Sequence, residues 1–561
     1  MSGRARVLAG SHKASRVLQS VLKYGTPQQI AALSAELRPD LPALAKDAYG
    51  THLVRRLIDV APKEDLQALV NTFKPTASRL ARHPFAAPAL DALYVRCTAA
   101  QRASLLATFY GPQMALARNA VSSTGSVGAA AVSLASVLQA QATPAGRRSV
   151  LSHVAAALTP ILEKGLVSFA YVHRLLAEYL PLVGPAGLAD ASASVAGPAL
   201  LRMIHTPDGT RAASMLLAGA SARERKACIK ALKGRVVDVA QDPCGHVALV
   251  AALECVDDTT LLAKGLLAEV QARMLDVALH PSARRLILNL LHPRCGRYLP
   301  PDIMAALPVA QEARVQAENG EAAPGNDVNA RDGGEDDDDD DDDHGVGDGK
   351  PGVLAASKKP PAVRRAQLLA FIGQGLVQMC SANAAQLLAH QHGCDVIYEV
   401  ARGGEGDALR TAVGDAQMQQ LIDALATAVA APESTPICKN TARSDGAAAD
   451  DDAATSPLRE EFHASRTLRR LVLDSPQAAD ALWTRCLSAD VARWATGHGA
   501  KVLAACCVCA HAKTSAAAGA ALKQVKGVLC PGQTASQWAA QFMNTEHAAE
   551  GDKNEAVQAK N

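Results

Sequence analysis

The sequence predicts an all-α protein, an α-solenoid of about eleven helical repeats. Its 561 residues are too many for one ordinary globular core, which favours several domains or a long repeat array. Hydrophobic residues make up 49% of the chain but aromatic residues only 3%, and such a composition favours helices packed on helices. In addition, one short motif recurs at intervals of roughly 36 residues.

The recurring motif is a small residue, then a polar or basic cluster, then an apolar run at helical spacing. Its small residues are Ala14, Gly50, Ala86, Gly209, Gly245 and Ala283, with further copies at Gly393, Ala464 and Gly499 and looser ones at Tyr110-Gly111 and around 167–168. A unit of this length holds two or three short helices and cannot bury its apolar face alone, so the units must stack. Strand signals are weak throughout.

Two acidic segments interrupt the array. Residues 312–350 hold fifteen acidic and three basic residues, and such a segment repels itself and has no apolar surface to bury. The predicted organisation is helical repeats at 11–310, a disordered acidic linker at 311–360, a repeat segment at 361–431, a disordered acidic loop at 432–457, repeats at 458–545 and a flexible tail at 546–561.

The net charge of +2 hides an asymmetry between this insert and the rest of the chain. Outside 312–350 the chain has 54 basic and 40 acidic residues, so a basic body suits a polyanionic partner. The insert itself is either a solvated tether or a competitor of nucleic acid for the basic surface.

No motif of an enzyme or of a membrane protein is evident. The chain has no P-loop, no GxSxG elbow, no HExxH and no dinucleotide fingerprint, so we expect neither catalysis nor a cofactor. No signal peptide and no membrane-spanning run is visible, and we expect no membrane partner. The 13 cysteines form no paired framework and are typical of a reducing compartment.

Two motifs invite a metal interpretation that we do not favour. Cys506-Cys507-Val508-Cys509 contains one CxxC but no second ligand pair, so buried helical cysteines are expected instead of a zinc site. Asp257-Asp258 is expected to begin a helix, where acids interact favourably with the helix dipole.

Residues 221–241 predict two helices in detail. Ser221 and Glu224 fit a capping box, and Cys228, Ile229 and Leu232 form an apolar face. Gly234 is expected to end this helix before a second one starts at Val236.

The segment Ser15-Arg16-Val17-Leu18-Gln19 resembles the reading helix of the Pumilio-homology (PUF) repeat. In that family two side chains contact a base edge and flank a stacking residue. The resemblance implies that Ser15 and Gln19 contact a base edge and that Arg16 stacks.

The other repeats depart from the family's base-reading pattern, but several can still contact RNA. The candidates, repeat by repeat, are Thr51, His52 and Arg55 in the second repeat; Thr210, Arg211 and Ser214 in the repeat at 209; His246 in the repeat at 245; and Arg284 and Arg285 in the repeat at 283. Arginine and histidine can stack on bases. The candidate phosphate contacts are Lys230, Lys233, Arg235, Arg211, Arg284, Arg285, Arg55 and Arg16. The expected mechanism is backbone-dominated binding with little dependence on sequence.

Four stretches resemble the divergent Puf-A/Penguin group of this family, namely residues 11–19, 205–211, 223–234 and 245–259. The block 205–259 is expected to lie in the group's CPL region. The resemblance implies a curved or L-shaped monomeric array that binds RNA and double-stranded DNA, resides in the nucleolus and nucleus, and acts with pre-ribosomal particles in large-subunit ribosome biogenesis and rRNA processing. It also implies a role in translation regulation.

Two other functions remain open from the sequence. A sequence-specific PUF-type mRNA repressor would need several intact base-reading trios. A HEAT- or armadillo-like protein-interaction scaffold would need no basic residues aligned on one face.

Overall fold

The computed structural model describes residues 4–111, 133–195, 197–307, 359–431 and 457–543, and every regular element in these ranges is a helix. This confirms the predicted all-α class. The chain divides into two compact units, which are treated separately: unit 1 comprises residues 1–228 and 305–358, and unit 2 comprises residues 229–304 and 359–561. The division falls inside α17 (Ala222–Leu232) and was not predicted from the sequence.

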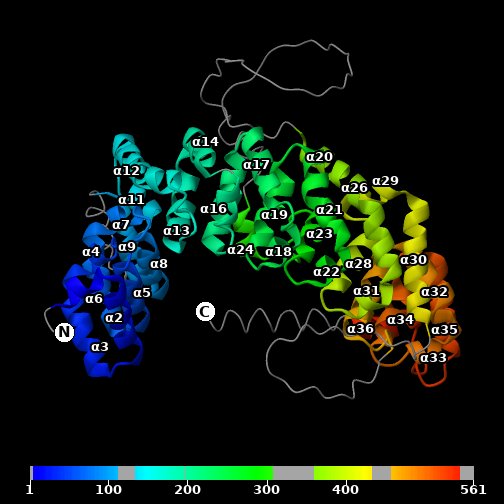
Figure 1. Cartoon of the computed structure of the whole chain (residues 1–561). Coiled ribbons are helices and arrows are strands. Elements are labelled where there is room, and N and C mark those ends of the chain that lie inside the picture. The colour runs from blue at the N-terminus through cyan, green and yellow to red at the C-terminus, as the bar shows by residue number, and fades with distance from the viewer. Residues whose placement is uncertain (1–3, 112–132, 196, 308–358, 432–456, 544–561) are drawn as a thin grey trace, which may run out of the picture. The chain divides into compact units, whose positions relative to one another are not determined.

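Unit 1 contains a row of helices that start at the repeat motif and are called motif helices below (Figure 1). Each motif helix packs on the next, in the order α2 (His12–Tyr24), α5 (Gly50–Val60), α8 (Ala87–Arg96), α13 (Ala170–Tyr179) and α16 (Pro207–Gly219). Behind them lie the backing helices α3 (Pro27–Leu37), α6 (Leu66–Phe73), α9 (Ala99–Leu106), α12 (Pro144–Glu163) and α14 (Gly184–Val195). Shorter helices join the rows, namely α1 (Ala5–Ala9), α4 (Leu41–Leu44), α7 (Ala77–Ala81), α11 (Leu134–Gln139) and α15 (Pro198–Leu201).

Unit 2 repeats this arrangement. Its motif helices pack in the order α19 (Gly245–Cys255), α23 (Arg284–Leu291), α28 (Gly393–Arg402), α31 (Phe462–Asp474), α34 (Gly499–Val508) and α36 (Ala535–Met543). The backing helices are α21 (Ala268–Ala272), α26 (Pro361–Ala382), α30 (Asp415–Ala430), α32 (Pro476–Arg485) and α35 (Ala512–Gln524). Shorter helices are α18 (Val236–Gln241), α20 (Thr259–Leu262), α22 (Met274–Leu279), α24 (Pro301–Ala306), α27 (Ala384–Ala389), α29 (Ala408–Val413) and α33 (Val491–Trp494).

The small residue of the motif is required by close packing. A Cβ atom on Gly50 would lie 2.6 Å from the carbonyl oxygen of Leu44, and one on Gly245 would lie 2.7 Å from that of Val239. The same oxygen, six residues earlier, blocks a side chain at Gly209. At these three glycines the backbone of the motif helix passes directly over a preceding carbonyl group.

The residue three positions before the small one fixes this turn. The Oδ1 atom of Asp47 accepts hydrogen bonds from the N–H groups of Tyr49 and Gly50, at 2.9 and 2.7 Å. Asp242 does the same for Cys244 and Gly245. These bonds satisfy N–H groups at the helix start that have no partner within the helix.

Arginines complete the other ends of the motif helices. Arg102 donates to the carbonyl oxygens of Tyr94 and Val95 at the end of α8, and Arg225 donates to Leu217 and Ala218 at the end of α16. The end of α5 receives Arg96 from the following repeat, which donates to carbonyl oxygens that include that of Ala61. A guanidinium suits these carbonyls because it offers several donors in one plane and a positive charge at the negative end of the helix dipole.

The two helices predicted in residues 221–241 are confirmed. The N–H of Ser221 donates to Glu224 at 2.8 Å and the N–H of Glu224 donates to the Ser221 hydroxyl at 3.4 Å, which is the predicted capping box. Cys228, Ile229 and Leu232 are buried. Gly234 has a φ of +79°, a conformation that favours glycine and ends the helix.

The structure shows which of the predicted repeat motifs begin a helix. The motif copies at 14, 50, 86, 209, 245, 283, 393, 464 and 499 each lie at the start of a motif helix, whereas α36 was not anticipated. The residues that follow the copy at Tyr110-Gly111 lie outside the described residues. So do nearly all of the predicted acidic linker 311–360, nearly all of the acidic loop 432–457, and the tail 546–561.

Candidate nucleic-acid interface

The residue after the small one ties neighbouring repeats together in unit 1. The hydroxyl of Ser15 on α2 donates to the carbonyl oxygen of Tyr49 at 3.0 Å, and the hydroxyl of Thr51 on α5 donates to that of Phe85 at 2.6 Å. Both side chains are buried. This geometry does not support the predicted base-edge contact of Ser15 or the predicted RNA contact of Thr51, because each hydroxyl donates to a carbonyl oxygen at the start of the next motif helix.

Other predicted base-reading side chains are also turned inward. Half-buried Gln19 donates to the Ser15 hydroxyl at 3.2 Å. Thr210 donates to the carbonyl oxygen of Ile204 at 3.0 Å, and Ser214 donates to that of Thr210 at 2.9 Å. Thr210 and Ser214 are buried, so these two cannot contact RNA in this arrangement.

His246 is fully buried and also serves the fold. Its Nδ1 atom lies 3.1 Å from the carbonyl oxygen of Asp242, and its Nε2 atom lies 3.1 Å from the guanidinium of Arg285. Since a guanidinium only donates, Nε2 accepts and Nδ1–H donates. Burial lowers the pKa of His246 to about 4, so the ring is neutral at pH 7. The predicted RNA contact of His246 is contradicted.

Arg284 and Arg285 are engaged within the protein rather than free for phosphates. Arg284 donates to the carbonyl oxygen of His392 at 3.2 Å and pairs with Asp395. Arg285 donates to the carbonyl oxygen of Tyr298 at 3.2 Å, and burial lowers its pKa. Their predicted RNA-binding role is thus not supported by the geometry.

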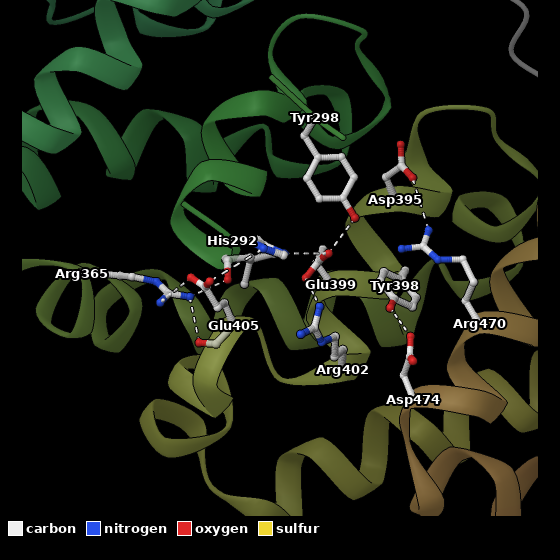
Figure 2. Close-up of polar contacts among 11 residues, drawn as sticks. His292, Tyr298, Arg365, Asp395, Tyr398, Glu399, Arg402, Glu405, Arg470 and Asp474 are labelled. Atoms are coloured by element: carbon white, nitrogen blue, oxygen red, sulfur yellow. Dashed lines mark hydrogen bonds and ion pairs between the residues drawn. The ribbon is translucent and has the colours of Figure 1, made fainter. Parts of the chain in front are cut away.

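The ion pair of Arg284 with Asp395 belongs to a larger polar network in unit 2, part of which Figure 2 shows. Asp395 also lies 4.0 Å from Arg470, whose guanidinium stacks 3.6 Å from the ring centroid of Tyr398. Tyr398 in turn donates its hydroxyl to Asp474. The positive charge of the arginines is balanced here by carboxylates of neighbouring motif helices.

A buried carboxylate lies at the centre of the same network (Figure 2). Glu399 on α28 accepts a 2.6 Å hydrogen bond from the hydroxyl of Tyr298 and lies 3.4 Å from Nδ1 of His292. Glu405 also lies near His292, at 3.8 Å, and near Arg365, at 3.7 Å. Burial, followed by the bond to Glu399, raises the pKa of Tyr298. This network connects neighbouring repeats of unit 2 through a carboxylate that is itself buried.

Unit 1 has a different electrostatic character. Arg16, His52, Arg55 and Arg211 are exposed on motif helices, and none of them forms an ion pair within the described part of the chain. Arg16 and Lys23 lie along one stripe of α2, and His52 and Arg55 lie along one stripe of α5, because residues three, four or seven apart share a helix face. These predicted RNA-binding side chains are therefore accessible at the surface of unit 1.

Lys230, Lys233 and Arg235 are exposed as well, but they are not on a motif helix. Lys230 lies in α17, which follows the motif helix α16, and the other two lie in the turn after it. In unit 2 the carboxylate of Glu269 accepts from the N–H groups of Gly234 and Val236, so an acid lies beside this turn.

Sequence reasoning missed two basic residues in unit 2. Arg466 on α31 is exposed and Lys501 on α34 is half-buried, and each stands two positions after the small residue of its repeat, as Arg16 and Arg211 do. Counting forward from Ala464 and Gly499 would have found them.

The two metal-like motifs have the structural roles that we expected. Asp258 accepts from the N–H of Leu261 at 2.8 Å at the start of α20, and Asp257 pairs with Arg364 at 3.0 Å. The cysteines at 506, 507 and 509 are buried, and burial raises the pKa of each thiol. Among the described residues, no helix has the length and apolar character needed to cross a membrane.

Stacked motif helices, backed by a second row of helices, define the class of α-helical repeat proteins. Two family models match the chain: "Pumilio-family RNA binding repeat" matches residues 14–38 and 41–71, and "CPL (NUC119) domain" matches residues 352–479. The block 205–259, which we expected in the CPL region, lies outside the matched residues.

Relatives extend this similarity over nearly the whole chain. Pumilio homolog 24 from Arabidopsis thaliana is 34% identical over 511 residues, which cover 90% of this chain and 76% of the relative. Human Pumilio homolog 3 is 24% identical over 413 residues, and the matched part spans 56% of that protein. The chain therefore belongs to the Pumilio-homology family.

Solved structures agree on the fold. The crystal structure of human Puf-A covers 93% of this chain with a TM-score of 0.71 at 22% identity, and the match covers 89% of that structure. A structure of human Puf-A in complex with DNA has a TM-score of 0.70 at 21% identity.

Proposed function

We propose that this protein binds RNA mainly through the phosphate backbone and with little sequence preference. The observation that carries the proposal is the contrast between two sets of side chains. The side chains that would read bases, among them Ser15, Thr51 and Thr210, are buried in contacts between or within repeats, whereas Arg16 and Arg211 remain exposed and unpaired within the described residues. Such a surface attracts phosphates but cannot distinguish bases by their edges.

Membership of the Pumilio-homology family, with its match to an RNA-binding repeat, supports the same proposal. In the cell we propose a role in large-subunit ribosome biogenesis and rRNA processing in the nucleolus, with pre-ribosomal particles as partners. The resemblance to the Puf-A/Penguin group supports this role and extends it to double-stranded DNA binding and translation regulation. We further propose a monomeric binding protein without catalytic activity.

The test is RNA affinity as a function of salt, with two RNAs of unrelated sequence. We expect similar affinities for both and a steep decrease in affinity with salt. Reversing Arg16, Arg55 and Arg211 to Glu should weaken binding by about a hundredfold at low salt, because three phosphate contacts become repulsive.

A matched control reverses Arg79, Arg148 and Arg223, which are exposed in unit 1 but lie outside the motif helices. This control changes the net charge equally and should retain most of the affinity. A strong preference for one RNA would favour the mRNA-repressor function, and absence of binding at low salt would favour a protein scaffold.

A further inference from the structure

Unit 2 presents a group of rings at the starts of two neighbouring motif helices. Phe462 at the start of α31 is 50% exposed, although it is one of only seven phenylalanines in the chain. Its ring centroid lies 5.3 Å from that of His463 and 5.9 Å from that of His498 at the start of α34, both in edge-to-face geometry. Phe462 is thus an exposed aromatic side chain, outside the buried core, in edge-to-face contact with two imidazoles.

Positive charge accompanies the rings on the same two helices. Arg466 stands four residues after Phe462 and Lys501 stands three residues after His498, so each cation lies on the face of its helix that carries the ring. Neither cation forms an ion pair within the described residues. The nearby carboxylate of Glu460 is already engaged, since it lies 3.3 Å from Arg459 and accepts from the N–H of His498 at 3.4 Å.

We propose that Phe462, His463 and His498 form a stacking site for a base of single-stranded nucleic acid, with Arg466 and Lys501 holding the adjoining phosphates. Aromatic rings beside unpaired cations match the two halves of a nucleotide, a flat apolar base and an anionic phosphate. An uncharged peptide would satisfy the ring but would leave the two cations without a partner. The site rests on the proposed RNA binding and adds to it a contact in unit 2 that depends on bases.

The test compares three probes on the full chain: a ten-nucleotide single-stranded RNA, the same phosphodiester chain without bases, and an RNA duplex. Phe462→Ala should weaken binding of the single-stranded RNA by about tenfold and leave binding of the abasic chain and the duplex unchanged. Phe371→Ala is the matched control, because Phe371 is 39% exposed in the same unit but lies on the backing helix α26. It should bind all three probes like the wild type.

The tryptophans provide an independent check of folding. All three lie in unit 2, at 483, 494 and 538, and all are buried, so an unchanged tryptophan spectrum shows that unit 2 of the variant is folded. Wild-type affinity of Phe462→Ala for the single-stranded RNA would overturn the stacking site, and so would an equal loss for the abasic chain. If the Arg16, Arg55 and Arg211 reversal still weakens binding, only the stacking site falls; if the wild type binds no RNA, both proposals fall.

Discussion

Gly209→Ala is expected to destabilise unit 1 by about 3 kcal/mol, the cost of forcing a methyl group into a filled site. A Cβ atom at this position would overlap the carbonyl oxygen of Met203 and would lie 2.8 Å from both Nδ1 of His173 and Oγ1 of Thr206. Those two atoms are themselves hydrogen-bonded at 2.7 Å, and Thr206 caps α16. The methyl group therefore displaces a helix start and breaks a bond between two repeats.

Urea unfolding followed by far-UV circular dichroism measures this effect. Gly10→Ala is the control in the same unit, because a Cβ atom there meets only one atom, at 3.9 Å, and its φ of −78° suits alanine. We expect the control to unfold like the wild type. An unchanged midpoint for Gly209→Ala would show that the backbone can move away from Met203 at little cost.

Lowering the pH from 7 to 4 is expected to remove about 3 kcal/mol of stability from each unit through one histidine. His173 in unit 1 and His246 in unit 2 are fully buried, and burial lowers the pKa of each to about 4, from an ordinary value of 6.5. Between pH 6.5 and 4 the unfolded chain binds these protons and the folded chain does not. The contribution of these two histidines to the free energy of unfolding is therefore fully present above pH 6.5 and is lost as the pH falls toward 4.

Tryptophan fluorescence during urea unfolding reports the change in unit 2. Carboxylates also titrate in this range, so His246→Gln is the required comparison. A glutamine can donate to the carbonyl oxygen of Asp242 and accept from Arg285 as the neutral imidazole does, but it does not titrate. The variant should lose less stability than the wild type between pH 6.5 and 4. Identical losses would mean that the folded protein binds the proton of His246 as readily as the unfolded chain does, which would contradict the prediction.

The repeat architecture could be predicted from the sequence because its determinants are local. Gly50, Gly209 and Gly245 recur where the backbone passes over a preceding carbonyl, and no side chain is tolerated there. The capping box of Ser221 and Glu224 is likewise contained within four residues. Signals of this kind can be found before anything is known of the tertiary structure.

The candidate site was predicted only in part because exposure is decided between repeats. Ser15 and Arg16 are neighbouring polar residues of the same motif, yet Ser15 is covered by the start of α5 and Arg16 is not. Arg284 has a basic side chain at a reading position, but Asp395, 111 residues later, neutralises it. Such pairings over long separations leave no periodic trace in the sequence.

The arginine that closes α5 belongs to the next repeat, and this gives the array a direction. Arg96 supplies donors to carbonyls at the end of a helix that finished more than thirty residues earlier. A fragment cut at the 36-residue period, before α8, would thus contain α5 without the donors to the carbonyls at its end. Fragments for crystallography or repeat grafting should extend past this arginine, so that the natural building block is one repeat plus the beginning of its successor.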